Sequence, residues 1–504
     1  MRLKTTGKFI IGAVCGALVT LSVYSIADDS KNQRSSNDSK SNTISPIPME
    51  DINNFAKVYA ITKNFYVEST TDTKLIKGAI SGMLSNLDPH SSYLDQNDFK
   101  QLSEMTSGSF AGIGIEISRD KDSGGIKVVA PIDGTPAYIN GIKSGDVIIK
   151  IDGQPVSGLP LDEAIKKMRG VAGTKVLITI SRKGELQPLK FNIIRTNIIV
   201  KSVKYTILDK NYAYIRITNF QSDTITELVT ALNNIYTQNP GLKGIILDLR
   251  DDPGGLLQAA VGVTGAFIPQ NSLVVYTQGR APDTNQKFYV MPKYYNLSDS
   301  TAGNDILSKV PEIFKSLPMV VLINQGSASA SEIVSGALQD YKRAKIVGTK
   351  SFGKGSVQSV IPLTQDTAVK ITTALYYTPK GRSIQAKGIK PDIIVQNEYN
   401  DLYDSWELSE ATLDKHIDNP THTVSVTKDK ENTPIITPPK QIKTEAELKA
   451  RLKEQLSKRP KVTKPSVAIV DLKNDFQLQW ALNIIEGKPL PNVKHKTGTT
   501  KKTD

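Results

Sequence analysis

Residues 244–255 read GIILDLRDDPGG, and this stretch decides the fold of the largest part of the 504-residue chain. Residues 244–249 are apolar except for Asp248, which is typical of a strand buried on both faces of a parallel sheet. Residues 252–255 form a Pro-Gly turn, and an apolar helical pattern begins at Leu256. A strand, a turn and a helix in succession predict one crossover unit of an α/β domain.

The same alternation continues on both sides of this unit. It predicts strands and helices at residues 212–217, 222–236, 319–323 and 331–339. Strands that alternate with helices indicate a mostly parallel sheet. Residues 369–377 alternate more strictly between apolar and polar, which predicts an edge strand. We therefore expect an α/β core over residues 198–400.

Two smaller regions precede the core. Apolar residues recur at spacings of three and four through residues 49–107, which predicts a helical region too small to bury its own core. Residues 108–197 change to a period of two with frequent glycines, which predicts a β-rich domain with one helix at 161–168. Its strands are expected at residues 113–117, 126–129, 147–151 and 176–180.

The N-terminus has the pattern of an export signal. Arg2, Lys4 and Lys8 precede an apolar run over residues 9–27. The pattern fits both a cleaved signal peptide and a retained membrane anchor, and both place the rest of the chain outside the cytoplasm. We expect the bacterial periplasm or the outer face of the inner membrane. Residues 28–48 are polar and predict a linker.

The C-terminal region, residues 401–504, is expected to be flexible and basic. Residues 440–504 hold 15 lysines and arginines against 7 aspartates and glutamates, and the whole chain has a net charge of +13. The charge has no interleaved aromatic platform and no recognised reader motif, so nucleic-acid binding is not expected. Residues 417–441 predict disorder, and two short helices follow at 445–456 and 476–485.

A serine-rich turn is the first candidate for chemistry. Residues 324–332 read NQGSASASE and lie between a predicted buried strand and a predicted helix. A helix N-terminus presents unpaired N–H groups with partial positive charge, so a serine there, such as Ser329, can be a nucleophile beside an oxyanion site. The alternative is that one of these serines only caps the helix.

The base for such a serine cannot be a histidine of the core, because none of the four histidines lies within residues 198–400. Lys354 lies in the glycine-rich turn SFGKGS, residues 351–356, where it could be buried. To act as a base its pKa must fall from about 10.4 to roughly 7–8. Residues 348–354 also match the start of a phosphate-binding loop, but Gly355 replaces the Ser or Thr that loop requires.

At these residues the chain resembles the carboxyl-terminal processing proteases, tail-specific peptidases with a Ser-Lys dyad and a PDZ domain. The resemblance extends beyond residues 326–332. It includes the segments AISGML (79–84), LDPHS (87–91), LDLRDDPGG (247–255), YTPKGRSIQ (377–385) and GIKPD (388–392).

The resemblance implies a role for each matching residue. Ser329 is the nucleophile, Lys354 the general base and Gln358 the residue that orients the lysine. The oxyanion hole consists of the Ala330 N–H and the N–H of Gly254 or Gly255. Asp340 matches an acidic position of the family, for which a structural role is equally open. Asp252 stands where the family often has asparagine, and little effect is expected from this difference.

The β-rich domain resembles a PDZ domain. Gly112, Ile113, Gly114 and Ile115 match its carboxylate-binding loop, and residues 141–148 match its central turn. Such a loop holds the carboxylate of a peptide C-terminus while the peptide adds as a strand. Arg169 resembles a position thought to couple this domain to the protease site. An ordinary surface arginine is the alternative.

The chain is therefore expected to be an exported serine endopeptidase that recognises protein C-termini and cleaves through an acyl-enzyme without a metal or other cofactor. Expected partners are proteins or peptides with free C-termini, a second copy bound through the N-terminal helices, and an envelope adaptor protein. Two alternatives stay open: a catalytically silent PDZ adaptor, and a hydrolase that acts on substrates other than peptides.

Overall fold

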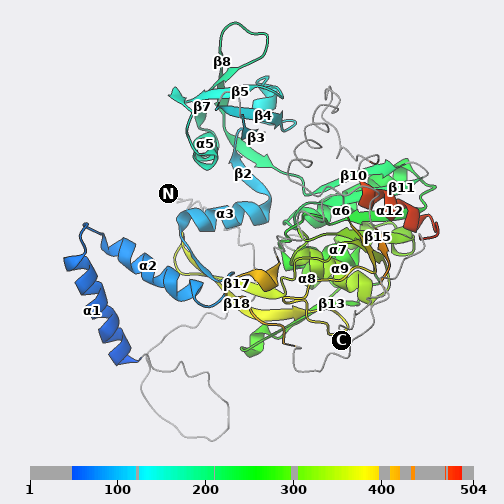
Figure 1. Cartoon of the computed structure of the whole chain (residues 1–504). Helices are drawn as coiled ribbons and strands as arrows, with labels where there is room; N and C mark the ends of the chain where they lie inside the picture. The colour runs from blue at the N-terminus through cyan, green and yellow to red at the C-terminus, as the bar shows by residue number, and fades with distance from the viewer. Residues whose placement is uncertain are drawn as a thin grey trace, which may run out of the picture. The chain divides into compact units, whose positions relative to one another are not determined.

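The computed structural model describes residues 48–120, 124–208, 211–296, 305–396, 409–420, 433–436, 472 and 475–490. Figure 1 shows the course of these residues from the first described helix to the last. They divide into two compact units. The first contains the described residues up to Phe99 together with Gln358–Thr373, and the second contains Lys100–Val357 and the described residues from Ala374 onward.

The first unit confirms the helical N-terminal region. Helix α1 covers Met49–Phe65 and α2 covers Asp72–Ser85. The short strand β1 (Ser92–Leu94) pairs antiparallel with the first residues of β18 (Ala368–Tyr377). No residue of α1 is buried, so its apolar side has no partner among the described residues. Helix α3 (Gln96–Ser107) follows.

A PDZ domain opens the second unit. Its sheet has the strand order β3-β4-β5-β7-β8, and β6 pairs with β5. The strands are β3 (Ile115–Arg119), β4 (Ile126–Pro131), β5 (Val147–Ile151), β6 (Gln154–Pro155), β7 (Lys175–Ser181) and β8 (Leu189–Ile194). Alternate apolar residues such as Ile126, Ile148 and Ile178 face a buried core, onto which the predicted helix α5 (Leu161–Met168) packs.

The protease core is built on a seven-stranded sheet with the order β10-β11-β12-β15-β16-β19-β20. The strands are β10 (Val203–Leu208), β11 (Tyr212–Ile217), β12 (Gly244–Asp248), β15 (Met319–Ile323), β16 (Lys345–Gly348), β19 (Ile393–Val395) and β20 (Ile435–Ile436). Only β10, at the edge, is antiparallel to its neighbour. The prediction of a mostly parallel sheet is therefore confirmed.

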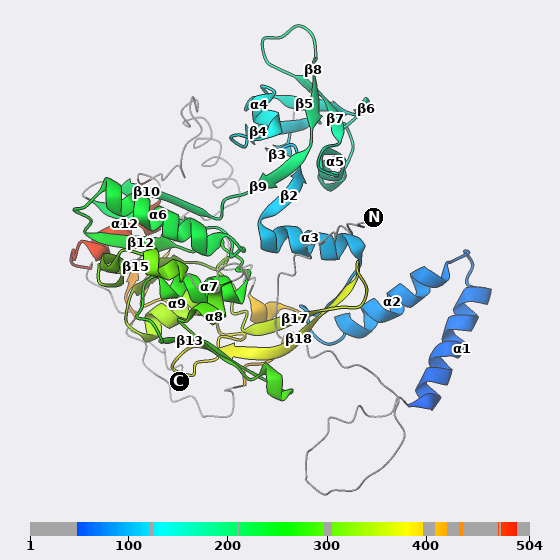
Figure 2. The same ribbon diagram turned by 180° about the vertical axis from the view of Figure 1, so that it is seen from behind.

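Helices cover both faces of this sheet (Figure 2). One face packs on α6 (Thr224–Gln238), α7 (Leu257–Gly265) and α9 (Ala330–Asp340). The other face packs on α12 (Phe476–Ile485), through Leu478 and Ala481. Because both faces are covered, the central strands β12 and β15 are almost entirely apolar and fully buried, as the run at 244–249 predicts.

Two strand predictions differ from the structure. Strand β18 is not an edge strand, because it pairs with β1, β13 (Leu273–Gly279) and β17 (Ser356–Pro362). Alternation of apolar and polar residues indicates that one face of a strand is buried. It does not indicate how many neighbouring strands pair with it. Strand β20 lies inside the stretch predicted to be disordered, where two adjacent β-branched isoleucines extend the sheet beside β19.

The prediction of a single strand over residues 113–117 is also wrong. The chain forms β2 (Ser109–Gly112) and then β3, and Gly114 between them has φ +78°. Strand β2 pairs with β9 (Thr196–Ile199) and not with the PDZ sheet. The predicted export signal and the helix at 445–456 lie outside the described residues. Within the described residues, no helix has the length and apolar character needed to span a membrane.

Candidate active site

Ser329 lies in the turn between β15 and α9, immediately before the helix begins. Its φ of +54° is in the left-handed region, which is uncommon for a residue with a side chain and marks a strained turn. The turn is held against the end of β12, because the Ser327 hydroxyl donates to the Leu249 carbonyl at 2.7 Å. The contact with the end of β12 therefore holds the strained turn in its conformation.

The Pro-Gly-Gly turn after β12 lies directly against Ser329. Gly254 has φ +95°, and a Cβ atom there would lie 2.6 Å from the Ala328 carbonyl oxygen and 2.9 Å from Ser329 Cβ. A Cβ atom on Gly255 would lie 2.1 Å from the Phe220 carbonyl oxygen. Only glycine fits at both positions. The glycine turn at residues 252–255 therefore packs directly against the serine turn at residues 324–332.

Two backbone N–H groups remain available around Ser329. Within the described part of the chain, neither the Ala330 N–H nor the Gly255 N–H makes a hydrogen bond. The Gly254 N–H is different, since it donates to Asp252 Oδ1 at 2.9 Å. Of the two glycines that the sequence left open, Gly255 has the N–H group that is available for an oxyanion.

Glu332 connects the serine turn to the lysine loop. Its Oε2 atom accepts hydrogen bonds from the backbone N–H groups of Ser329 and Lys354, both at 2.9 Å. Its Oε1 atom accepts from the Gly353 N–H at 2.7 Å and the Ser351 hydroxyl at 2.5 Å. The side chain is fully buried. Burial raises the pKa of Glu332 to about 7, although the four donors favour the ionised form.

Tyr376 of β18 makes a second connection between the same two loops. Its hydroxyl lies 3.1 Å from the Ser329 carbonyl oxygen and also contacts the Lys354 carbonyl oxygen. Burial raises the pKa of Tyr376 well above its ordinary value, so the hydroxyl keeps its proton and acts as the donor. The structure thus brings the backbones of Ser329 and Lys354 together, 25 residues apart in sequence.

Gln358 lies on β17 and belongs to the first compact unit. Its side-chain amide donates to the Thr372 hydroxyl at 3.2 Å, and that hydroxyl donates to Asp88 Oδ1 at 3.0 Å. Ser91 completes the group by donating to Asp88 Oδ2 at 2.6 Å. The LDPHS segment of the N-terminal region is therefore linked through Thr372 to Gln358, which is close to Lys354 in sequence.

Asp340 is the last residue of α9 and lies far from Ser329 along the helix, which has 11 residues and is about 16 Å long. Its carboxylate accepts from the Lys380 N–H at 2.8 Å and pairs with Arg382 at 2.6 Å. These contacts connect the end of the helix to the TPKGR segment. They favour the structural role over a part in the chemistry.

The four residues of the PDZ loop are placed where β2 ends and β3 begins. Ile113 is buried, and Gly114 has no room for a side chain because Thr135 lies where its Cβ would be. Arg169 lies beside Gly112, pairs with Glu104 at 2.7 Å and stacks over the Phe110 ring at 4.5 Å. Arg169 is thus held next to the loop by specific contacts and is not a free surface arginine.

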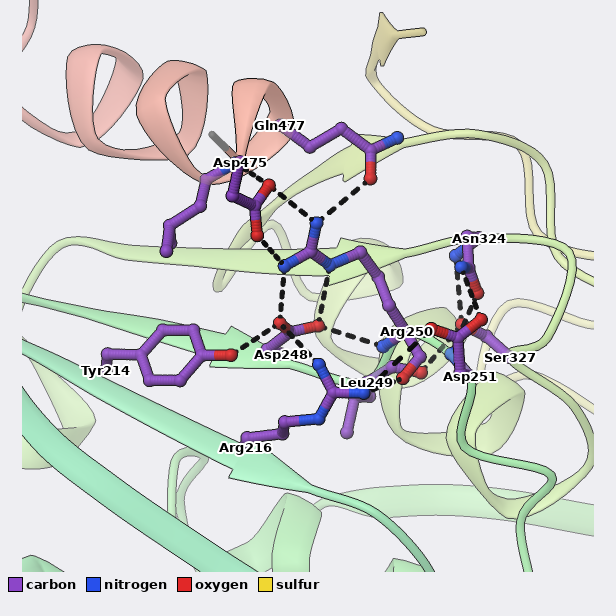
Figure 3. Close-up of polar contacts among 11 residues, drawn as sticks. Tyr214, Arg216, Asp248, Leu249, Arg250, Asp251, Asn324, Ser327, Asp475 and Gln477 are labelled. Atoms are coloured by element: carbon purple, nitrogen blue, oxygen red, sulfur yellow. Dashed lines mark hydrogen bonds and ion pairs between the residues drawn. The ribbon is translucent and has the colours of Figure 1, made fainter. Parts of the chain in front are cut away.

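Figure 3 shows how the C-terminal helix is attached to the strand that carries the glycine turn. Arg250 lies between two carboxylates, 2.7 Å from Asp248 and 2.6 Å from Asp475, which directly precedes α12. Burial alone would raise the pKa of Asp248, but Arg250 and Arg216 hold it below its ordinary value. The network therefore stays ionised and fixes α12 to the end of β12.

Sequence reasoning gave no role to Glu332, Tyr376 or Arg250. One of them had a usable signal, since Ser329 and Glu332 have the Ser-x-x-Glu spacing of a capping box, in which the glutamate accepts from the backbone of the capping residue. Tyr376 and Arg250 had none, because their partners are distant in sequence. No group of three or more His, Cys, Asp or Glu side chains suited to a metal occurs among the residues described.

Comparison with known proteins identifies the family of the chain. Three family patterns match the chain: peptidase family S41 at residues 211–395, the PDZ domain at 101–181, and the activating protease CtpB N-terminal domain at 9–98. A carboxy-terminal-processing protease of Bartonella bacilliformis is 44% identical over 367 residues, which cover 72% of this chain and 80% of the relative.

A second relative and a solved structure are also similar to the chain. A probable CtpA-like serine protease of Staphylococcus aureus is 38% identical over 357 residues, 71% of this chain and 67% of the relative. Among solved structures, the photosystem II D1 C-terminal processing protease is 28% identical with a TM-score of 0.39, and the match covers 68% of this chain and 86% of that one.

Proposed function

Because the chain belongs to peptidase family S41 and is a carboxy-terminal-processing serine protease with a PDZ domain, we propose that its chemistry is carried by a dyad of Ser329 and Lys354. The single observation that carries the proposal is the double connection through Glu332 and Tyr376, which joins the backbones of the two residues. Lysine replaces histidine as the base.

In the proposed mechanism the neutral Lys354 amine takes the proton of the Ser329 hydroxyl as the oxygen attacks the scissile carbonyl carbon. The resulting oxyanion accepts hydrogen bonds from the N–H groups of Ala330 and Gly255. The lysine ammonium then protonates the leaving amine, which leaves an acyl-enzyme on Ser329. Water, deprotonated by Lys354, hydrolyses this ester and restores the serine.

Gln358 is proposed to orient the Lys354 amine. The support is its fixed position, since its amide is hydrogen-bonded to Thr372, and Thr372 in turn to the buried Asp88. A side chain held in this way keeps one rotamer and can direct its remaining groups without a further entropic cost.

The PDZ domain is proposed to bind the C-terminal carboxylate of the substrate at residues 112–115. We expect a peptide with a free C-terminus to be cleaved with a KM about tenfold lower than its C-terminally amidated analogue, because the amide loses a charge-assisted interaction with the loop N–H groups. The kcat should change less than KM, since the chemistry occurs at another site. Steady-state cleavage of a matched peptide pair measures both.

The control for this experiment is Ser329→Ala, which should cleave neither peptide yet bind the free-carboxylate peptide more tightly in a direct binding assay. Equal KM values for the two peptides would refute C-terminal recognition while leaving the dyad intact.

The N-terminal helices are proposed to form a homodimer interface. One side of α1 presents apolar side chains at helical spacing, and all are substantially exposed: Ile52, Phe55, Val58, Ile61 and Phe65. An exposed apolar stripe of this kind marks an interaction surface.

We expect the double variant Phe55→Asp, Ile61→Asp to be monomeric where the wild-type protein is dimeric, because two buried charges without partners would oppose association. Size-exclusion chromatography with light scattering measures the mass. Asn53→Asp, on the opposite side of the same helix, is the matched control and should stay dimeric. A wild-type protein that is monomeric at micromolar concentration would contradict the proposed interface.

Export to the cell envelope is also proposed, on the basic residues before the apolar run at 9–27. An envelope adaptor protein as a partner remains a prediction of the sequence. Fractionation of cells that express the full chain would test the location, and recovery of the protein in the cytoplasmic fraction would contradict it.

A further inference from the structure

Asp252 is a buried carboxyl group that the proposed mechanism does not use. It lies between the end of β12 and the two glycines, and it is completely inaccessible to solvent. Its backbone carbonyl accepts hydrogen bonds from the Ala328 N–H and the Ser331 hydroxyl, both at 3.0 Å. Asp252 therefore lies on the contact between the glycine turn and the serine turn.

The two oxygens of this carboxyl group have different surroundings. Oδ1 accepts the Gly254 N–H at 2.9 Å. Oδ2 is buried without a hydrogen-bond partner in the described part of the chain. An ionised carboxylate with one buried, unsatisfied oxygen is strongly disfavoured, whereas a neutral acid tolerates the same position at much lower cost.

The charges around the turn do not compensate for this burial. They come from Arg216 on β11, Asp248 and Arg250 at the end of β12, Asp251 in the turn, Glu332 on α9 and Lys354 in the loop that Glu332 holds. Arg250 is committed to Asp248 and Asp475, and Arg216 to Asp248 and Asp251. Burial raises the pKa of Asp252 to about 7, against smaller opposing effects of the Gly254 N–H, the Ser331 hydroxyl and Arg216.

We propose that Asp252 is a positioning residue that acts as the neutral acid: it holds the Gly254 N–H, so that of the two glycines only Gly255 presents its N–H, beside that of Ala330, to the substrate oxyanion. The inference rests on the proposed dyad mechanism and deepens it. The hydrogen bond between the Asp252 carboxyl group and the Gly254 N–H thus fixes the orientation of the following peptide, which carries the Gly255 N–H.

The ionised form is expected to be a poor catalyst. Its negative charge would lie one peptide group away from the oxyanion that forms in the transition state, and in a buried site such a charge opposes the developing one. Activity should therefore rise with pH as Lys354 loses its proton and fall again as Asp252 loses its own. A bell-shaped profile of kcat/KM is the consequence.

The decisive variant is Asp252→Asn, which keeps an oxygen for the Gly254 N–H but cannot ionise. It should raise kcat/KM about tenfold at pH 9 and change it little at pH 6, so that the decline on the alkaline side disappears. Asp252→Ala removes the acceptor and should lower kcat about tenfold at both pH values with little effect on KM.

Asp251→Asn is the matched control, because it removes the same charge from the adjacent, solvent-exposed residue. Its pH profile should equal that of the wild type. Thermal unfolding gives a second readout. Since the pKa of Asp252 is higher in the folded chain than in the unfolded one, the wild type should lose stability relative to Asp252→Asn as the pH rises from 3.8 to about 7.

An Asp252→Asn profile that superimposes on the wild-type profile, with Ser329→Ala inactive, would overturn this inference and leave the dyad standing. Activity retained by Ser329→Ala would instead refute the proposed function itself.

Discussion

Replacing Ser329 or Lys354 with alanine is expected to lower kcat/KM for a peptide substrate by at least about 10⁴-fold. Ser329→Ala removes the attacking oxygen, and Lys354→Ala removes the base that activates it. Since the two residues act as one unit, the double variant should be no less active than either single variant. Cleavage of a quenched fluorescent peptide measures the rates.

The controls for the dyad separate chemistry from folding. Lys350→Ala removes an exposed lysine four residues earlier and should keep full activity. Lys354→Arg should remain inactive, because a guanidinium does not lose its proton in proteins and cannot act as a base. All variants should unfold near the wild-type temperature. A Lys354→Ala enzyme with normal turnover would remove the lysine from the mechanism.

The second large effect is expected at Glu332. Glu332→Ala leaves three backbone N–H groups and one serine hydroxyl without their acceptor. The Gly353 N–H and the hydroxyl are buried, and each such group costs about 1–3 kcal/mol, whereas the N–H groups of Ser329 and Lys354 are part-buried. Because neighbours relax, we expect a loss of roughly 3–5 kcal/mol in the free energy of unfolding and a fall in kcat of about 10²-fold or more, since the serine turn and the lysine loop lose their common partner.

Glu332→Gln refines this expectation. The amide keeps one oxygen but directs an NH₂ group at donors, so two of the four hydrogen bonds are lost and both effects should be intermediate. Glu312→Gln, at an exposed carboxylate paired only with Lys315, is the matched control. Chemical denaturation and separate kcat and KM values provide the measurement. An unchanged kcat in Glu332→Ala would show that Glu332 does not position the dyad.

Local sequence patterns predicted the elements of this chain well, because burial imposes a periodicity on each strand and helix. Strands 212–217 and 319–323 and helices 161–168 and 476–485 have the predicted bounds. What the sequence could not supply is which strands are neighbours. The edge position predicted for 369–377 failed for this reason, since a strand with two or more neighbours can have the same alternation.

The candidate site was predictable as a set of residue types but not as a structure. The absence of histidine in the core led to lysine, and the small residues at 324–332 indicated that another backbone can approach closely. The connections through Glu332 and Tyr376 join residues 22 to 47 positions apart and follow only from the folded sheet. The same holds for Asp252, whose substitution for asparagine seemed harmless until its burial was known.

The central claim is that Lys354 activates Ser329, and labelling with a serine-reactive fluorophosphonate tests it most directly. Peptide mass spectrometry of the labelled wild-type protein should find one adduct, on Ser329, and the rate of labelling should fall by at least about 100-fold in Lys354→Ala. An adduct on Ser327 or Ser331, or an equal rate in the Lys354→Ala variant, would contradict the account.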